Sequence, residues 1–246
     1  MFERTREIWR EAVAMGMLRH ELETLLPPAR SHELLSRFRA ISKSVECPHN
    51  ESHVLSFVVA LLKLPPGIEG CIVEAGCYKG GSTAKLSLVA RYLGRPLVVF
   101  DSFEGLPPNS EDHDRTIHGT SVRGWFRPKA FCGSLEEVRK NVGTHGDLEV
   151  CRFVEGWFED TMPGFQEKIC AAYLDVDLAA STRTCLKHLY PRLAPGGFLM
   201  SQDGDFPLVI DVFRDDTFWR EVVGCGRPPM EGLGKSKMVT VAKAPA

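Results

Sequence analysis

Carboxylate side chains stand close together at two places in the chain, each directly after a short apolar run. Asp175 and Asp177 follow one run, and Asp203 and Asp205 follow the next, with Gln202 beside them. Side chains two residues apart share a face of an extended strand, so the first two carboxylates would repel unless a metal ion, a proton or a basic group relieved them. Oxygen ligands from two strand ends suit magnesium or another hard cation. The pattern predicts a functional cluster of Asp175, Asp177 and Asp203, and helix capping by single aspartates is the alternative.

A glycine-rich turn follows the first apolar run and reads Glu-Ala-Gly-Cys-Tyr-Lys-Gly-Gly-Ser-Thr over residues 74–83. Glycine lets a backbone turn sharply and approach a ligand closely, and Gly80-Gly81 before a helix leaves amide groups free at its N-terminus. The spacing is not G-x-G-x-x-G, so the dinucleotide fingerprint is absent. An acidic residue followed by a single glycine suits the amino-acid end of S-adenosylmethionine, and a plain glycine-rich turn is the alternative.

Asp101 ends the second apolar run, where a carboxylate can accept hydrogen bonds from both hydroxyls of a ribose. The alternative is a helix cap. The glycine turn that precedes it in the chain favours ribose contact.

Four histidines are further candidates for the site. His113 and His118 lie in a long loop, where a histidine is more often exposed than catalytic. His49 and His53 have the i, i+4 spacing that can chelate a metal, but a solvated helix start is the favoured interpretation.

The elements that must position these residues alternate along the chain. From residue 70 short apolar runs alternate with amphipathic segments, which indicates βαβ units and a mostly parallel sheet. The predicted strands cover residues 71–75, 97–100, 148–154, 169–177, 198–201 and 237–242. The predicted helices between them cover residues 81–93, 134–142, 181–190 and 208–222, the second opened by Ser134 with Glu137 at the capping-box position.

The first 66 residues predict a helical extension of three helices. The first helix ends near Leu26, the second covers residues 31–41, and the third begins at Ser52 and contains an apolar run that extends to Leu64. We expect these helices to cap one side of the active site. Residues 67–246 predict a Rossmann-like domain with helices on both faces of its sheet, within a single-domain protein overall. The loop over residues 102–128 is long enough to be a lid.

Composition narrows the class of protein. The 246 residues carry a formal net charge of −2, so neither a nucleic acid nor an anionic membrane is expected as a partner. The eight cysteines form no C-x-x-C pair, and we expect reduced thiols in a cytoplasmic protein. The N-terminus has no apolar region typical of a secretory signal.

Taken in order, several segments resemble the macrocin O-methyltransferase family of class I enzymes. The most specific are Asp-Ser-Phe-Glu-Gly-Leu-Pro from Asp101 and Gly-Trp-Phe from Gly156. The other segments that carry the resemblance are 73–76, 79–82, 134–142, 159–163, 175–178, 181–182, 190–193 and 195–197. The match covers roughly residues 70–205.

The resemblance implies a Rossmann-like methyltransferase fold, S-adenosylmethionine as methyl donor, a divalent cation such as Mg²⁺, and a hydroxyl acceptor on a small metabolite or a natural-product sugar. It implies Asp177 as the general base and Asp175, Gln202 and Asp203 as metal ligands. The residues implied to bind the cofactor are Glu74, Gly76, Tyr78, Lys79, Gly80, Ser82, Asp101, Ser102, Phe103, Gly156, Trp157, Phe158 and Asp175. The N-terminal helices are candidates for a homodimer contact.

Two departures from the family pattern keep other functions open. Gln202 stands where the family usually has an acid, so metal affinity should fall, although Asp205 is a possible substitute. Ala179 stands where the family usually has an aromatic residue, which puts the sugar substrate in doubt. The alternatives are a metal-independent O- or N-methyltransferase and a non-catalytic cofactor-binding homologue. A nicotinamide-dependent oxidoreductase is disfavoured by the missing fingerprint.

Overall fold

The computed structural model describes residues 2–245 and, among these, the side chains of residue 9 and of residues 11–245. A seven-stranded sheet runs in the order β3-β2-β1-β4-β5-β7-β6, with its first five strands parallel and the last two antiparallel. The strands are β1 (Cys71–Ala75), β2 (Leu97–Asp101), β3 (Cys151–Glu155), β4 (Ile169–Leu174), β5 (Leu193–Ser201), β6 (Met230–Glu231) and β7 (Val239–Ala242).

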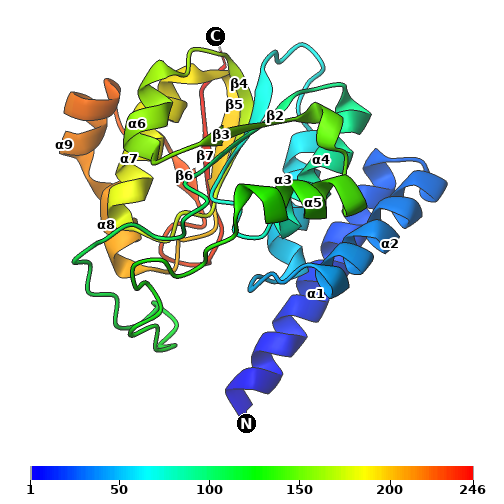
Figure 1. Ribbon diagram of the computed structural model, residues 1–246, viewed down its shortest axis with the longest axis horizontal. Helices are drawn as coiled ribbons and strands as arrows, with labels where there is room; N and C mark the ends of the chain where they lie inside the picture. Colours follow the sequence, from blue (N-terminus) through cyan, green and yellow to red (C-terminus); the bar gives the residue numbers. More distant parts are fainter. Residues whose placement is uncertain (1, 246) are drawn as a thin grey trace.

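Two layers of helices enclose the sheet (Figure 1). One layer consists of α1 (Phe2–Leu25), α2 (Pro28–Ser44), α3 (Glu51–Leu62), α4 (Gly81–Leu93) and α5 (Leu135–His145). The other consists of α6 (Phe158–Thr161), α7 (Ala179–Leu189), α8 (Pro207–Arg214) and α9 (Asp216–Phe218). The predicted α/β class with helices on both faces is confirmed, and it is the arrangement of Rossmann-like proteins.

The central strands are mostly apolar because both of their faces are covered. In β1, Val73 and Ala75 pack into the core shared with α7 and α8, whereas Ile72 packs into the core shared with α3 and α4. Phe57 of α3 lies 5.2 Å from the Tyr173 ring in β4, so an N-terminal helix covers the sheet directly. This explains why the strands read as nearly continuous hydrophobic runs.

The carboxyl ends of the parallel strands lie at one level. Ala75 pairs with Leu174, and Leu174 pairs with Ser201. The strand order reverses between β1 and β4, which opens a crevice beyond these ends. The residues that follow each strand therefore meet at a single edge, as the sequence predicted.

Several predicted strand boundaries were wrong. The fourth strand ends at Leu174 and not at Asp177, because the chain turns there and Asp177 adopts a positive φ of 59°. The third begins at Cys151, since residues 148–150 form a 3₁₀ turn capped by the Asp147 side chain. The fifth begins at Leu193 and contains an irregularity that accommodates Gly196 and Gly197.

The predicted helix over residues 208–222 is interrupted at Asp215. The Asp215 carboxylate accepts a hydrogen bond from the Phe218 amide at 2.9 Å and starts the short α9, which continues as a π turn over Trp219–Val223. The third helix begins at Glu51, and the Ser52 hydroxyl donates to Glu11 instead of capping it. The Ser134 cap is confirmed, because its hydroxyl accepts a hydrogen bond from the Glu137 amide at 3.2 Å. The structure also contains α6 and β6, which the sequence did not predict.

Among residues 2–245 no helix is both long enough and apolar enough to cross a membrane. All eight cysteines are free thiols.

Candidate active site

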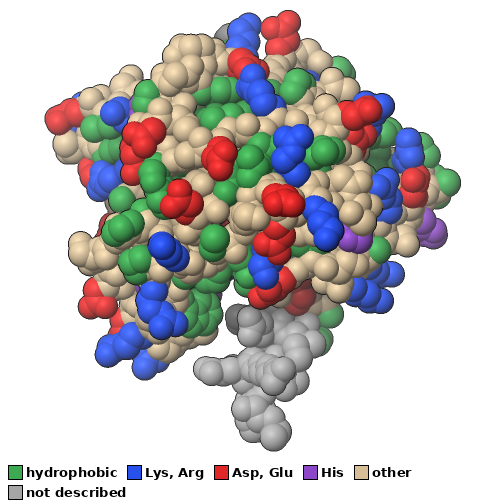
Figure 2. Space-filling model, viewed as in Figure 1, with side chains coloured by type: hydrophobic (Ala, Val, Ile, Leu, Met, Phe, Trp, Pro, Cys, Tyr) green, Lys and Arg blue, Asp and Glu red, His purple; other side chains and the backbone are tan. Residues whose placement is uncertain are grey.

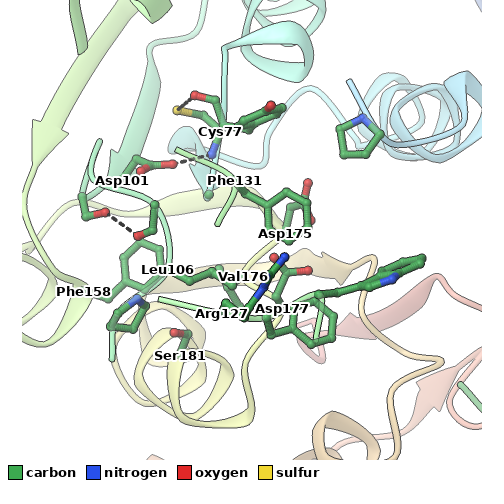
Figure 3. A pocket seen from close by; sticks show the side chains of 18 of the residues that line it. Cys77, Asp101, Leu106, Arg127, Phe131, Phe158, Asp175, Val176, Asp177 and Ser181 are labelled. Atoms are coloured by element: carbon green, nitrogen blue, oxygen red, sulfur yellow. Dashed lines mark hydrogen bonds between the residues drawn. The ribbon is translucent and has the colours of Figure 1, made fainter. Parts of the chain in front are cut away.

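A cavity of about 460 Å³ lies beyond the carboxyl ends of the parallel strands (Figure 3). Its walls come from the turn after β1, the segment after β3, the end of β4 and the loop over residues 102–134, hereafter the lid. His49, which precedes α3, and Lys237, which precedes β7, complete it. A concave site of this size is typical for a small organic ligand.

The turn after β1 passes against the end of β4, and Gly76 makes this possible. Gly76 has a φ of +81°, and a Cβ atom there would lie 1.9 Å from the Asp175 carbonyl oxygen. The next residue, Cys77, donates its backbone N–H to Asp101 Oδ2 at 2.7 Å. The glycine therefore holds the cofactor-type turn between the ends of β2 and β4.

Asp101 lies in the cavity wall and joins two loops. Its Oδ2 atom accepts the Cys77 amide, and its Oδ1 atom accepts the Phe103 amide at 2.8 Å. Burial raises the pKa of the Asp101 carboxyl, and these backbone amides act in the opposite direction. The carboxylate is thus fixed in orientation beside the cavity.

The predicted cofactor residues divide into two groups. Eight line the cavity: Gly76, Tyr78, Asp101, Ser102, Gly156, Trp157, Phe158 and Asp175. The other five lie outside its lining: Glu74, Lys79, Gly80, Ser82 and Phe103.

Contacts and burial explain why two members of the second group, Lys79 and Glu74, lie outside the lining. Lys79 forms an ion pair with Glu46 at 2.6 Å, away from the cavity. Glu74 is fully buried, and neither of its carboxyl oxygens has a hydrogen-bond partner among the described residues. Burial raises the pKa of Glu74 to about 8.

Three carboxylates meet where β4 and β5 end. Asp175, Asp177 and Asp203 each offer an oxygen within 4.8 Å of the others. Asp203 Oδ2 accepts hydrogen bonds from the amides of Val176 at 3.0 Å and of Asp177 at 3.1 Å. These bonds hold the turn in which Asp177 has its positive φ. The predicted cluster is thus present in space, although a turn and not an extended strand brings the two aspartates together.

The three carboxyls of this cluster differ in their proton affinity. Burial and the nearby Asp203 and Asp175 charges raise the pKa of Asp177 well above its ordinary value. Burial and the Asp175 charge raise the pKa of Asp203 to about 7. Burial also acts to raise the pKa of Asp175, but the charge and hydrogen bond of His49 outweigh it and lower that pKa. A cation would relieve this crowding, and the buried Asp203 Oδ1 has no hydrogen-bond partner among the described residues.

The carbonyl oxygen of Gln202 is not available to this cluster. It accepts a hydrogen bond from the Tyr173 hydroxyl at 3.1 Å, so that oxygen is already engaged in the core. The Gln202 side chain nevertheless lies close enough to Asp175 to help lower the pKa of that carboxyl. Asp205, the possible substitute, lies outside the group of three. The donors that fit a hard cation are therefore Asp175, Asp177 and Asp203.

His49 contacts the cluster, and the expectation of a solvated histidine was wrong. Its Nε2 atom lies 2.9 Å from Asp175 Oδ2, and its side chain is only 18% exposed. His53, four residues on, is buried in α3, and burial lowers its pKa to about 4. No sequence signal links His49 to an aspartate 126 positions away, because the fold of the N-terminal helices alone brings them together.

The lid is attached to α7 and not loose. Glu111 accepts hydrogen bonds from the amides of Ala179 and Ala180, both at 2.8 Å, at the N-terminus of that helix. His113 Nε2 lies 2.8 Å from Glu111 and its ring packs against Phe126, outside the cavity lining. His113 thus acts in lid packing. His118 is exposed and likewise does not line the cavity.

Lys237 was not predicted from the sequence. It lines the cavity, and its positive charge helps to lower the pKa of Asp175 and opposes the rise that burial causes in the pKa of Asp177, Asp203 and Asp205. The Gly204 amide donates to its carbonyl oxygen at 2.8 Å, which fixes the segment before β7 against the end of β5. Lys237 comes 33 residues after Gly204 in the sequence, so only this backbone pairing in the folded chain shows that Lys237 lies at the site.

Known proteins resemble this chain in sequence. A model of the macrocin O-methyltransferase family matches residues 60–221. A tetracenomycin rhamnosyl 4′-O-methyltransferase of Streptomyces olivaceus is 38% identical over 160 residues, which cover 62% of this chain and 58% of that protein. The mycinamicin III 3″-O-methyltransferase of Micromonospora griseorubida is 27% identical over 179 residues, 64% of this chain and 70% of that protein. The chain thus spans less than two thirds of the first relative.

Solved structures share the fold. The calicheamicin methyltransferase CalS11 superposes with a TM-score of 0.61 and 21% identity over 88% of this chain and 93% of that one. The O-methyltransferase NovP gives a TM-score of 0.59 and 23% identity over 86% of this chain and 79% of that one. At these identities the likeness establishes the class I methyltransferase fold. Together with the family match over residues 60–221, it shows that the chain belongs to the macrocin O-methyltransferase family.

Proposed function

We propose that the protein transfers the methyl group of S-adenosylmethionine to a hydroxyl on a sugar of a natural product. The observation that carries this proposal is the single cavity that contains both the Gly76 turn with Asp101 and the carboxylates of Asp175 and Asp177. The relatives' names, which refer to O-methyltransferases of glycosylated metabolites, support the acceptor class.

The cofactor would lie along the turn after β1, with its ribose at Asp101 and its sulfonium directed toward the cluster. Trp157 and Phe158 offer apolar walls on the same side of the cavity. When bound, S-adenosylmethionine supplies the electrophilic methyl group. The chain's own contribution is to hold donor and acceptor in line, which accounts for much of the rate enhancement in such reactions.

Asp177 is the proposed general base. An alcohol is a poor nucleophile until it loses its proton, and Asp177 lines the cavity where it would accept that proton. A raised pKa makes its carboxylate a stronger base once ionised. Lys237 and a cation held by Asp175, Asp177 and Asp203 would both favour the ionised form. When bound, a divalent cation such as Mg²⁺ lowers the pKa of a hydroxyl that it coordinates.

The experiment is methyl transfer from S-adenosylmethionine, followed by mass spectrometry, to a panel of glycosides with free sugar hydroxyls. We expect Asp177→Asn to lower turnover by about 10²–10⁴-fold, the range for loss of a general base. Asp160→Asn, which changes an exposed aspartate of α6, is the matched control and should leave turnover unchanged. Unchanged turnover in Asp177→Asn would remove the base assignment.

A metal-independent methyltransferase acting on O or N is the second candidate. Two observations favour it: the Gln202 oxygen is occupied by Tyr173, and Lys237 already places a positive charge in the cavity. Full activity in EDTA would select this candidate, whereas loss of activity that Mg²⁺ restores would select the metal-assisted reaction. A non-catalytic homologue would bind S-adenosylmethionine without turning it over.

We further infer a cytoplasmic enzyme, which the eight free thiols support. A homodimer formed through α1 is supported by the exposed Trp9 and Met17 on that helix. Light scattering on the wild type and on Trp9→Glu tests this, because the variant should shift toward the monomer.

A further inference from the structure

Two cationic side chains line the cavity, and one of them, Lys237, also acts on the carboxylates of the acidic cluster. Arg127 from the lid and Lys237 from the segment before β7 are the cavity's arginine and lysine lining residues. Neither forms an ion pair with any residue in the described part of the chain. Other lid arginines are engaged: Arg123 pairs with Asp114 at 3.0 Å, and Arg115 donates to the Gly119 carbonyl oxygen.

Lys237 lies over an aromatic surface to which the lid contributes. The Lys237 ammonium lies 5.5 Å from the centroid of the Phe206 ring, which packs against Phe126 at 5.0 Å. Phe126 is buried, and its neighbours Trp125 and Arg127 both line the cavity. Trp125 remains 50% exposed, which leaves its ring available to a ligand.

The lid holds this surface in place. Its Glu111 is bonded to the start of α7, and its Ile117 amide donates to the Asp205 carbonyl oxygen at 2.9 Å. Both anchors lie on the elements that carry the acidic cluster. Residues 115–129 contain two further cationic side chains besides those of Arg123 and Arg127, and no acid. Figure 2 shows lysine and arginine side chains gathered on the projecting lid, at the lower left of Figure 1.

The sheet order separates this surface from the cofactor side. The glycine turn and Asp101 follow β1 and β2, whereas Lys237 precedes β7, beyond β5. The acidic cluster at the ends of β4 and β5 lies between them. A ligand group at Lys237 is therefore on the side of the acidic cluster away from the glycine turn and Asp101.

We propose that Arg127, Lys237 and Trp125 form a subsite for an anionic group, a phosphate or a carboxylate, carried by the acceptor. Guanidinium and ammonium groups are the usual partners of such anions, and an aromatic ring beside them packs against the group's apolar attachment. The identification of the ligand as the acceptor rests on the proposed function; the anion subsite itself does not.

The test is ligand-observed NMR titration of the full chain saturated with S-adenosylhomocysteine. The probes are rhamnose 1-phosphate, the neutral methyl rhamnoside and methyl glucuronide. We expect at least one anionic sugar to bind about tenfold or more tightly than the neutral one, as one charge-assisted hydrogen bond allows. The tighter of the two anions identifies phosphate or carboxylate as the source.

Variants assign the effect to the two side chains. Arg127→Gln and Lys237→Met should each weaken anion binding about tenfold, Arg127→Lys should retain part of it, and neutral-sugar binding should stay unchanged. Lys129→Met removes an exposed lid cation outside the cavity lining and serves as the control.

Three results would overturn the subsite: no binding of either anion to the wild type, equal binding of charged and neutral sugars, or variants that lose affinity for S-adenosylhomocysteine. Variants that lose affinity for S-adenosylhomocysteine would show that Arg127 and Lys237 bind the carboxylate of the cofactor and not the acceptor. Failure of the wild type to bind S-adenosylhomocysteine would instead contradict the proposed function, so the two failures are distinguishable.

Discussion

At the scale of single residues, the site depends on positions where only one side-chain type fits. Gly76 is such a position, because its φ is +81° and the Asp175 carbonyl oxygen occupies the place of a Cβ atom. The acidic cluster depends in the same way on Asp203, whose Oδ2 atom holds two successive amides. Even small substitutions at these two residues should therefore have large effects on ligand binding and stability.

Gly76→Ala is expected to abolish binding of S-adenosylhomocysteine and to destabilise the fold. The new methyl group requires the turn after β1 to move away from β4, and an alanine at positive φ adds strain of roughly 1 kcal/mol. Calorimetry and thermal unfolding measure the two effects. Gly67→Ala is the control, since nothing lies within 4 Å of its Cβ position. Wild-type binding by Gly76→Ala would contradict the assigned turn.

Glu74→Gln is expected to make the cofactor-free protein more stable at pH 8 and equally stable near pH 4.5. The pKa of Glu74 is raised from 4.5 to about 8 in the fold, so the folded form retains a proton that the unfolded chain releases across this window. Wild-type stability therefore falls as pH rises through it. The gain at pH 8 is a few kcal/mol at most, since one pKa unit corresponds to about 1.4 kcal/mol. A pH-independent difference in melting temperature would contradict this account.

Residue chemistry predicted the acidic cluster but not its neighbours. Aspartates after two adjacent strands meet because parallel strands end at one edge, which is a local rule. His49 reaches Asp175 only through the packing of α3 on the sheet, and no local pattern encodes that contact. The positive φ of Asp177 was equally hidden, because the amides that Asp203 holds belong to a different strand end.

At the scale of elements, the position of the lid over the cavity depends on its attachment to α7. The Glu111 carboxylate caps α7, so the lid position and the helix start are one structural unit. Ala179, noted as a departure from the family pattern, is one of the two residues that it binds.

Glu111→Gln is expected to loosen the lid, because a neutral amide binds the α7 amides and His113 less well than a carboxylate does. Loss of a helix cap costs about 0.5–2 kcal/mol. Limited proteolysis should cut within residues 102–134 faster than in the wild type, and the KM for the acceptor should rise. Glu104→Gln, an exposed lid residue, provides the comparison. Equal proteolysis rates would show that the tether does not hold the lid.

Element prediction succeeded where periodicity was strong and failed where tertiary contacts decide the boundary. The strands at 71–75 and 97–101 are buried runs between clear turn signals, and their positions were predicted closely. The break at Asp215 arises because its side chain caps a new turn inside an apolar helical pattern. Strand β6 has only two residues, so it exists solely through its pairing with β7.

At the scale of the whole molecule, one sheet edge gathers groups from both ends of the chain. His49 comes from before the sheet begins and Lys237 from just before its β7 strand, and both face the same carboxylates. The division into residues 1–66 and 67–246 remains a prediction. A shared core between α3 and the sheet means that the cavity depends on both parts.

The central claim is that an adenosyl compound and the acidic cluster share this cavity. A crystal structure with S-adenosylhomocysteine tests it most directly. The account predicts the adenosyl group beside Gly76 and Asp101, with the sulfur directed toward Asp177. An empty cavity, or a ligand whose sulfur points away from Asp175 and Asp177, would contradict it.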